Sequence, residues 1–127
     1  MKRHIATGLT LVAGIAIGAT AIQGLHAQAK PPTYVIVAIR KINDAAAYKT
    51  GVIDKAAPVI AAAGGHFVVR TDKITNFDGT PPQRYVILAF DSPEKAQAWH
   101  DSAAQKDIDA ARLKTTDSLS FMVDTMQ

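Results

Sequence analysis

The sequence lacks cysteine entirely, and its basic residues are not clustered. Without cysteine the chain cannot form disulfides, thiolate nucleophiles, or zinc and iron–sulfur sites with sulfur ligands. Lys2 and Arg3 are two of its 14 basic residues, so the chain after residue 29 has 12 basic and 11 acidic side chains and a net charge of +1. The longest basic run there is the pair Arg40-Lys41. Nucleic acid is therefore not an expected partner.

Catalytic and cofactor motifs are also missing. The sequence has no phosphate-binding loop, no dinucleotide-binding glycine motif, no nucleophile elbow and no haem attachment motif. Two histidines, His66 and His100, follow residue 29, and they lack the close spacing of a zinc-ligand pair. We therefore expect no cofactor and no metal site.

Residues 1–29 have the pattern of a secretory signal peptide. Lys2 and Arg3 precede an uncharged apolar run over residues 5–22, and the small residues Ala27 and Ala29 precede a predicted cleavage point. This pattern predicts a periplasmic or secreted protein. The alternative is a retained membrane anchor, since the run is close to the lower limit of about 17 residues for a spanning helix. Contact with a membrane is expected only through an uncleaved segment.

Residues 30–32 form a short linker that contains two prolines, and residues 33–127 are long enough for one small domain. Hydrophobic patterns and start and stop signals predict strands at 34–42, 66–77, 84–90 and 118–123, and helices at 45–63 and 93–113.

Local signals set several ends of these elements. Pro58 removes a backbone donor inside the first helix, so we expect a kink or a break near Ala57, and Gly64-Gly65 ends that helix. Ser92 is the expected N-cap of the second helix, with Pro93 at its first position. Alternation along the second strand predicts two opposite faces, one with Phe67, Val69 and Thr71 and the other with His66, Val68 and Arg70.

The order βαββαβ predicts a ferredoxin-like α+β fold, with a four-stranded antiparallel sheet and both helices on one face. The other face of that sheet has no cover within a chain of this length. A second copy of the chain is the expected cover. We therefore expect a homodimer in which two sheets pack against each other.

Several stretches of the chain, taken in order, carry a family resemblance. They are Asp44 with Tyr48, Ala57-Pro58, residues 63–70 (AGGHFVVR), Asp78-Gly79, residues 84–96 (RYVILAFDSPEKA) and residues 99–102 (WHDS). Over residues 33–124 the chain resembles the domain-of-unknown-function thirteen-thirty family.

The resemblance implies a dimeric α+β barrel formed by two ferredoxin-like units. The superfamily that this implies includes cofactor-free monooxygenases, small isomerases and haem enzymes, while the family itself has no settled activity. Its members often have Ser-Pro-x-Tyr after the aromatic residue of the second helix. This chain has Ser102-Ala103-Ala104-Gln105 there, so a site that depends on this tyrosine is altered.

Arg70 and Arg84 are the main candidates for ligand binding. They lie on adjacent predicted strands, and two fixed guanidinium groups are suited to binding a carboxylate or an enolate. The structural alternative is that they pair with acidic residues at the strand ends, namely Asp72, Asp78 or Asp91.

Three more residues are candidates for lining a binding site. Asp44 and Tyr48 are four residues apart at the start of the first helix and form a candidate carboxylate–phenol pair. The alternative is a helix cap followed by a core aromatic residue. Trp99 shares a helix face with Ala96 and Ala103, so we expect it to pack in the core, where it can also form the wall of a pocket.

His66 and His100 are the catalytic candidates, because either imidazole can carry a proton near neutral pH. The alternative for each is a surface or half-buried side chain with one hydrogen-bond partner. Asp107 and Asp109 are expected on a solvated helix face.

These residues support three hypotheses about function. The first is binding of a small organic acid or an aromatic compound in a cleft, with both histidines facing solvent. The second is a cofactor-free enzyme for proton transfer or oxygenation, with a histidine base beside an arginine in the cleft. The third is a structural or interaction module whose interior is filled and whose arginines are paired with acids.

Overall fold

The computed structural model describes residues 31–125, and the predicted signal peptide or anchor, residues 1–29, lies outside them. The elements in chain order are β1 (Thr33–Ile42), α2 (Ala45–Tyr48), the π-helical segment η1 (Lys49–Ile53), α3 (Asp54–Ala62), β2 (His66–Thr71), β3 (Arg84–Phe90), α4 (Pro93–Asp101), α5 (Ala103–Thr115) and β4 (Thr116–Asp124). No helix within this part of the chain is long and apolar enough to cross a membrane.

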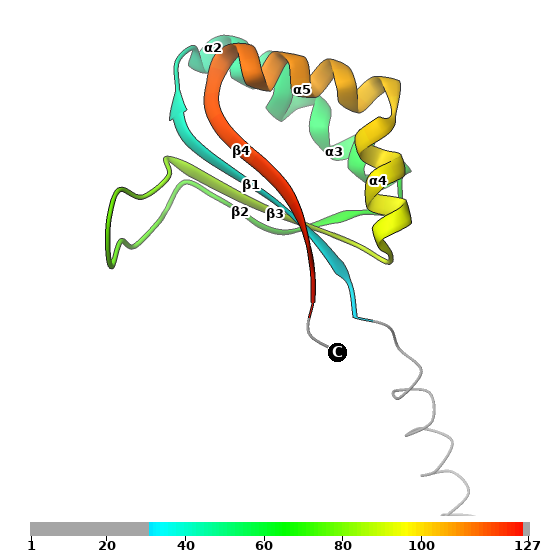
Figure 1. The fold of residues 1–127 in the computed structure, drawn as a ribbon. Coiled ribbons are helices and arrows are strands. Elements are labelled where there is room, and N and C mark those ends of the chain that lie inside the picture. The colour runs from blue at the N-terminus through cyan, green and yellow to red at the C-terminus, as the bar shows by residue number, and fades with distance from the viewer. Residues whose placement is uncertain (1–30, 126–127) are drawn as a thin grey trace, which may run out of the picture. The chain divides into compact units, whose positions relative to one another are not determined.

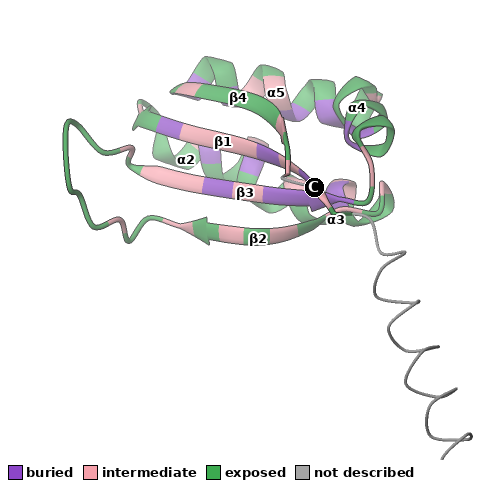
Figure 2. Cartoon of the chain, turned by 60° about the horizontal axis from the view of Figure 1, so that its bottom comes forward, coloured by how far each residue is buried: buried purple, intermediate pink, exposed green. Residues whose placement is uncertain are grey.

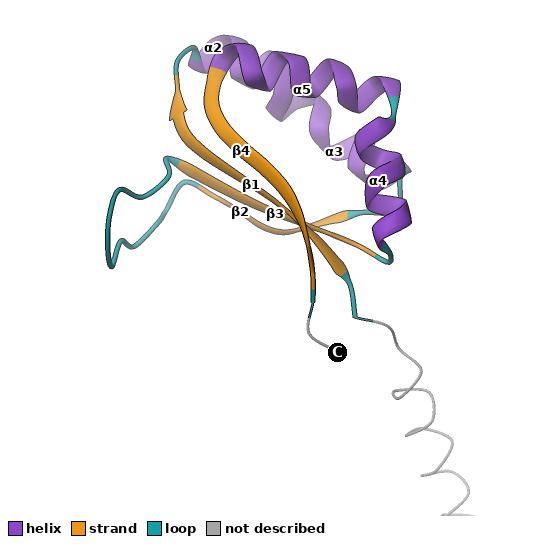
Figure 3. Cartoon of the chain, viewed as in Figure 1, coloured by secondary structure: helices purple, strands orange, loops and turns teal. Residues whose placement is uncertain are grey.

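The strands form one antiparallel sheet in the order β2-β3-β1-β4. The helices gather on one face of this sheet (Figures 1 and 3). This arrangement confirms the expected ferredoxin-like α+β fold. The helix starts are also as expected, because the side chains of Asp44 and Ser92 accept hydrogen bonds from the backbone N–H groups of Ala47 and Lys95.

The first helical region departs from the sequence prediction. No break occurs near Ala57, and α3 continues through Pro58 to Ala62. Pro58 lies inside α3 and has no N–H to donate to the carbonyl of Asp54, so the helix continues with one backbone hydrogen bond fewer. The irregular winding lies upstream instead, in η1, whose hydrogen bonds span five residues.

The second helical region is two helices and not one over residues 93–113. Ser102 separates α4 from α5 because its backbone is extended, at φ −65° and ψ 148°. Its hydroxyl accepts a hydrogen bond from the N–H of Gln105 (3.2 Å) and donates one to the carbonyl of Trp99 (2.7 Å). Ser102 is therefore both the end of α4 and the N-cap of α5.

The second strand is shorter than predicted and contains a bulge. It ends at Thr71 and not at residue 77, because its partner β3 begins only at Arg84 and offers no backbone groups beyond that point. Phe67 pairs with Leu88 and Arg70 with Val86, which leaves Val68 as the extra residue. The predicted alternation is therefore wrong, since the bulge brings Phe67 and Arg70 to the same face.

The core lies between the helices and the sheet, in two neighbouring clusters. One surrounds Phe90 and Trp99, whose rings are 5.3 Å apart, and the other surrounds Ile39 and Tyr48. Figure 2 shows that the two central strands, β1 and β3, carry most of the buried strand positions. These strands therefore form the floor on which the helices pack.

The face of the sheet opposite the helices is apolar and has no cover among the described residues. The strand registers align Ile36 with Ile87 and Phe121 on this face, and Ala38 with Tyr85 and Leu119. Leu119 and Phe121 are each 46% exposed. A large apolar surface is thus left open on one side of a thin, two-layer domain.

Candidate functional site

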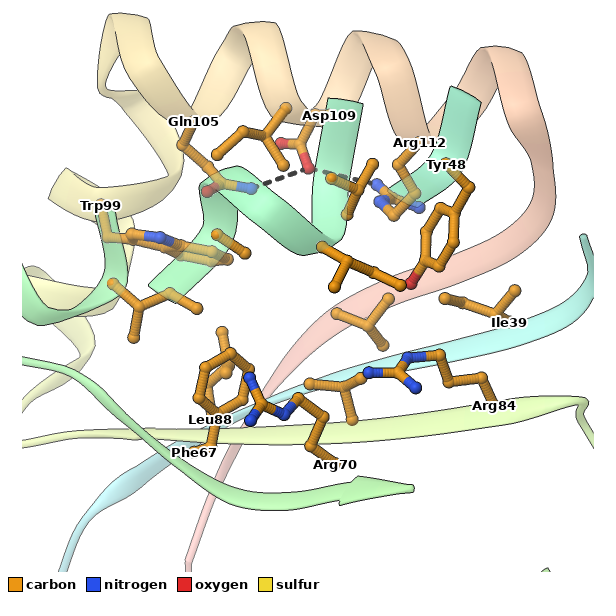
Figure 4. Close-up of a pocket in the computed structure, with 17 residues that line it drawn as sticks. Ile39, Tyr48, Phe67, Arg70, Arg84, Leu88, Trp99, Gln105, Asp109 and Arg112 are labelled. Carbon is orange, nitrogen blue, oxygen red and sulfur yellow. Dashed lines mark hydrogen bonds and ion pairs between the residues drawn. The ribbon is translucent and has the colours of Figure 1, made fainter. Parts of the chain in front are cut away.

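A cleft opens between the helices and the sheet, where the two core clusters meet. Its floor is formed by β1, β2 and β3 and its roof by α5 together with the segment from α2 to α3 (Figure 4). The cavity is narrow, with a volume of about 60 Å³. Most of its lining is apolar, and its polar side chains are those of Tyr48, Arg70, Arg84, Trp99, Gln105, Asp109 and Arg112.

Arg70 and Arg84 both line this cleft. Arg70 is opposite Val86 in the β2–β3 register, and Arg84 lies two residues before Val86 on the same face of β3. Arg70 is at the exposed edge, where its guanidinium carbon lies 4.4 Å from the centre of the Phe67 ring. Arg84 lies further in and is half-buried.

Neither arginine forms an ion pair within residues 31–125. Of the three acidic residues that were alternatives for pairing with them, Asp91 pairs instead with Lys95 at 3.1 Å. The structure therefore does not show the alternative in which Arg70 and Arg84 pair with acidic residues at the strand ends.

Tyr48 lies at the end of the cleft that contains Arg84, and its hydroxyl points towards that guanidinium (Figure 4). Burial raises the pKa of Tyr48 above the ordinary value of 10.0, although the charge of Arg84, its hydrogen bond to the phenol oxygen and the charge of Arg112 oppose the shift. At neutral pH the phenol therefore keeps its proton, and it is available as a hydrogen-bond donor.

The roof of the cleft carries a polar network on α5. Asp109 accepts hydrogen bonds from Gln105 Nε2 (3.1 Å) and Arg112 Nη2 (3.4 Å), and Arg112 also donates to Ser118 (2.6 Å). His100 Nδ1 lies 3.5 Å from the other oxygen of Asp109. Because Asp109 compensates the charge of Arg112, the excess positive charge of the cleft comes from the two strand arginines.

The cleft contains buried polar atoms that have no partner. Within residues 31–125, the buried side-chain atoms without a hydrogen bond are Arg84 Nε, Trp99 Nε1 and Gln105 Oε1, and all three residues line this cleft. Such atoms are uncommon in folded proteins because each costs desolvation energy. The cleft wall therefore contains two hydrogen-bond donors and one acceptor that no protein group in this part of the chain satisfies.

The other residues singled out from the sequence lie elsewhere. Asp44 is exposed and caps α2, so it forms no pair with Tyr48 in the cleft. His66 is exposed at the start of β2. His100 does not line the cleft. Its ring lies beside that of Trp99, its Nδ1 lies near Asp109, and 56% of its side chain is exposed.

Sequence reasoning missed the α5 residues. Asp109 was expected in solvent, but its side chain is only 18% exposed. Gln105, Ile108, Asp109 and Arg112 have the spacing i, i+3, i+4, i+7 of one buried helix face. That spacing was available as a signal, but three of its four members are polar.

No group of three or more His, Asp or Glu side chains in the described part of the chain is placed to hold a metal ion. Among the polar groups of the cleft, arginine and amide side chains predominate, and they are poor ligands for cations. The arrangement is suited to an anion.

Residues 32–126 match the model of a known family, a domain of unknown function (DUF1330). The chain belongs to this family. Gln105 stands where the family resemblance places a tyrosine, so the cleft of this member carries an amide at that position. No protein with a curated description matches the chain.

Solved structures of similar fold have low sequence identity to this family member. The RPA0582 protein of unknown function from Rhodopseudomonas palustris has a TM-score of 0.61 at 12% identity, over 85% of this chain and 93% of its own. SnoaB, a cofactor-independent oxygenase from Streptomyces nogalater, has a TM-score of 0.54 at 15% identity, over 77% and 96%. A putative antibiotic biosynthesis monooxygenase from Nitrosomonas europaea has a TM-score of 0.54 at 12% identity, over 76% and 100%. At these identities the likeness concerns the fold.

Proposed function

We propose that this protein binds a small organic acid whose carboxylate contacts Arg84 and whose apolar body fills the cleft. The observation that carries the proposal is Arg84 Nε, a buried cationic donor without a partner in a mostly apolar cavity. A guanidinium donates two parallel hydrogen bonds to a carboxylate. Binding would therefore satisfy the unpartnered donor and compensate its charge in one step.

The surroundings of Arg84 support an acid and not a simple inorganic anion. Tyr48 adds a neutral hydroxyl donor beside the guanidinium, and Arg70 adds a second positive charge at the edge of the cleft. Between them and Trp99 the walls are formed by side chains such as Val86, Leu88 and Ile108. Burial of these apolar walls stabilises a complex only when the ligand has an apolar body that covers them.

A cofactor-free enzyme with a histidine base is less well supported. That hypothesis needs a histidine in the cleft beside an arginine, and neither His66 nor His100 lines it. The fold is shared with a protein described as a cofactor-independent oxygenase, but that likeness does not extend to an identified residue of this chain. Binding is therefore the function that the geometry supports best.

We also infer that the protein works as a homodimer after export. The open sheet face has two apolar rows across β3, β1 and β4, and a second copy would cover them by the same face. A purely structural module is less well supported, because the cleft is not filled and its strand arginines are unpaired within the described residues. Removal of residues 1–29 and a periplasmic or secreted location remain predictions from the sequence.

Ligand titration followed by tryptophan fluorescence tests the binding proposal, since Trp99 is the only tryptophan and lines the cleft. The probes are benzoate, phenylacetate and hexanoate, with benzamide as the uncharged control. We expect saturable binding of at least one acid and none of benzamide. Arg84→Gln should weaken that binding roughly ten- to hundredfold, as expected for loss of a charge-assisted hydrogen bond of about 1.5–3 kcal/mol.

Arg40→Gln is the matched control. Arg40 is an exposed strand arginine that pairs with Asp117 at 2.9 Å, and it does not line the cleft. Its substitution should leave the affinity unchanged. Failure of all three acids to bind, or equal losses in the two variants, would refute the proposal.

A further inference from the structure

Two of the three unpartnered buried atoms lie on the helix side of the cleft, away from the strand arginines. They are Trp99 Nε1, which can only donate a hydrogen bond, and Gln105 Oε1, which can only accept one. Both residues are 4% exposed. In Figure 4 the two side chains occupy one end of the cleft, and Tyr48 and Arg84 occupy the other.

The chain itself holds these two residues close together. The hydroxyl of Ser102 bonds both the carbonyl of Trp99 and the N–H of Gln105, so the end of α4 and the start of α5 form one tight junction. The amide of Gln105 is oriented by its Nε2, which donates to Asp109 at 3.1 Å. Its Oε1 is therefore the atom left free.

A hydroxyl group matches this donor and acceptor. It accepts a hydrogen bond from Trp99 Nε1 through a lone pair and donates its own proton to Gln105 Oε1. A carbonyl could only accept a hydrogen bond from Trp99 Nε1, and an ammonium could only donate one to Gln105 Oε1. Each of these groups would leave the other protein atom without a partner. The junction is thus complementary to a neutral group that donates and accepts at once.

We propose that the ligand is a hydroxy acid, with its carboxylate at Arg84 and its hydroxyl between Trp99 and Gln105 across an apolar body. This inference rests on the proposed binding of an organic acid and adds the chemistry of the ligand's second end. Flat bodies such as a hydroxyphenyl ring suit the narrow cavity and the indole wall. The competing occupant of the junction is a water molecule, which can make the same two hydrogen bonds.

Calorimetric titration of the purified protein separates these alternatives, with 4-hydroxybenzoate, 4-hydroxyphenylacetate and 3-(4-hydroxyphenyl)propionate set against their three hydroxyl-free parents. The series varies the distance between the carboxylate and the hydroxyl of the ligand, so that it can be matched to the separation of Arg84 from the junction. We expect at least one hydroxy acid to bind about fivefold or more tightly than its parent, as expected for a net hydrogen bond of about 1 kcal/mol.

Two variants locate the effect. Trp99→Phe removes the donor and Gln105→Met removes the acceptor. In each variant the hydroxyl advantage, measured as the ratio of the affinities of a hydroxy acid and its parent acid for that same variant, should disappear. Gln97→Met is the matched control, because Gln97 makes the same amide-to-aspartate bond one turn along its own helix (to Asp101, 3.0 Å) but lies outside the cleft. It should keep the full advantage.

The outcomes distinguish this inference from the proposed function. If the parent acids bind through Arg84 and no hydroxy acid gains, water occupies the junction and the hydroxy-acid proposal is wrong. If the gain survives both Trp99→Phe and Gln105→Met, the hydroxyl is bound elsewhere and the proposal is also wrong. If no acid binds at all, the proposed function itself fails and this inference fails with it.

Discussion

Gly65 lies against the ring that supports the cleft wall, and Gly65→Ala should therefore destabilise the fold. A Cβ atom at residue 65 would lie 2.5, 2.7 and 3.0 Å from Cε1, Cζ and Cδ1 of Phe90. Phe90 is 1% exposed and packs on Trp99, so its ring has no free space to enter. Overpacking of this kind costs about 1–3 kcal/mol, which lowers the melting temperature by about 4–8 °C per kcal/mol in a domain of this size.

A double-mutant cycle identifies the cause. Phe90→Leu removes the two ring atoms closest to residue 65. The loss of unfolding free energy that Phe90→Leu causes should therefore be smaller by at least about 1 kcal/mol in Gly65→Ala than in the original protein. Gly64→Ala is the control, because its Cβ would meet no atom within 4 Å but its φ of +81° strains any side chain. Phe90→Leu should not relieve that strain. An unchanged melting temperature for Gly65→Ala, or additive effects of the two substitutions, would refute this description of the wall.

Three more predictions concern charge, burial and assembly. Burial raises the pKa of Tyr48 above 10.0, so the folded state holds the phenolic proton more tightly than the unfolded state. The free energy of unfolding therefore falls as the pH rises past 10. In thermal melts, Tyr48→Phe should lose less stability than the original protein between about pH 9 and pH 11. Asp109→Asn, which removes the charge partner of a buried arginine, should cost about 1–3 kcal/mol in denaturant unfolding, while the exposed Asp101→Asn costs less than about 0.5. Leu119→Lys on the open sheet face should shift the light-scattering mass from dimer to monomer, and Leu113→Lys, exposed on α5, should not; a monomer before any substitution would contradict the assembly.

Most of the fold could be predicted from the sequence because strong local signals agreed with one another. The Ser92-Pro93 helix start, the Gly64-Gly65 stop and the β-rich runs all point to βαββαβ. The exceptions arise where a single residue overrides the pattern. Ser102 breaks a helix whose flanking residues favour helix, and one inserted residue at Val68 reverses the faces of a strand. A bulge has no reliable sequence signal, because it depends on the register of the partner strand.

The candidate site was predictable only on its strand side. Arg70 and Arg84 could be paired from their places on adjacent strands, although the bulge was needed to bring Arg70 to the helix face. Gln105 and Asp109 could not be placed in the same way, since a continuous helix over residues 93–113 gives them a different phase from the helix that starts after Ser102. Which polar atoms remain unpartnered is a property of packing, and no sequence pattern reports it.

The most direct test of the central claim is the Nε–H signal of Arg84 in a ¹H–¹⁵N correlation spectrum, recorded while benzoate or the best-binding acid is added. The Arg84→Gln variant, which lacks the signal, assigns it. If the cleft binds the carboxylate at this buried donor, the Arg84 signal shifts saturably and exchanges more slowly with water, while that of Arg40 stays in place. A saturable shift elsewhere with Arg84 unchanged, or no shift anywhere, would contradict the account.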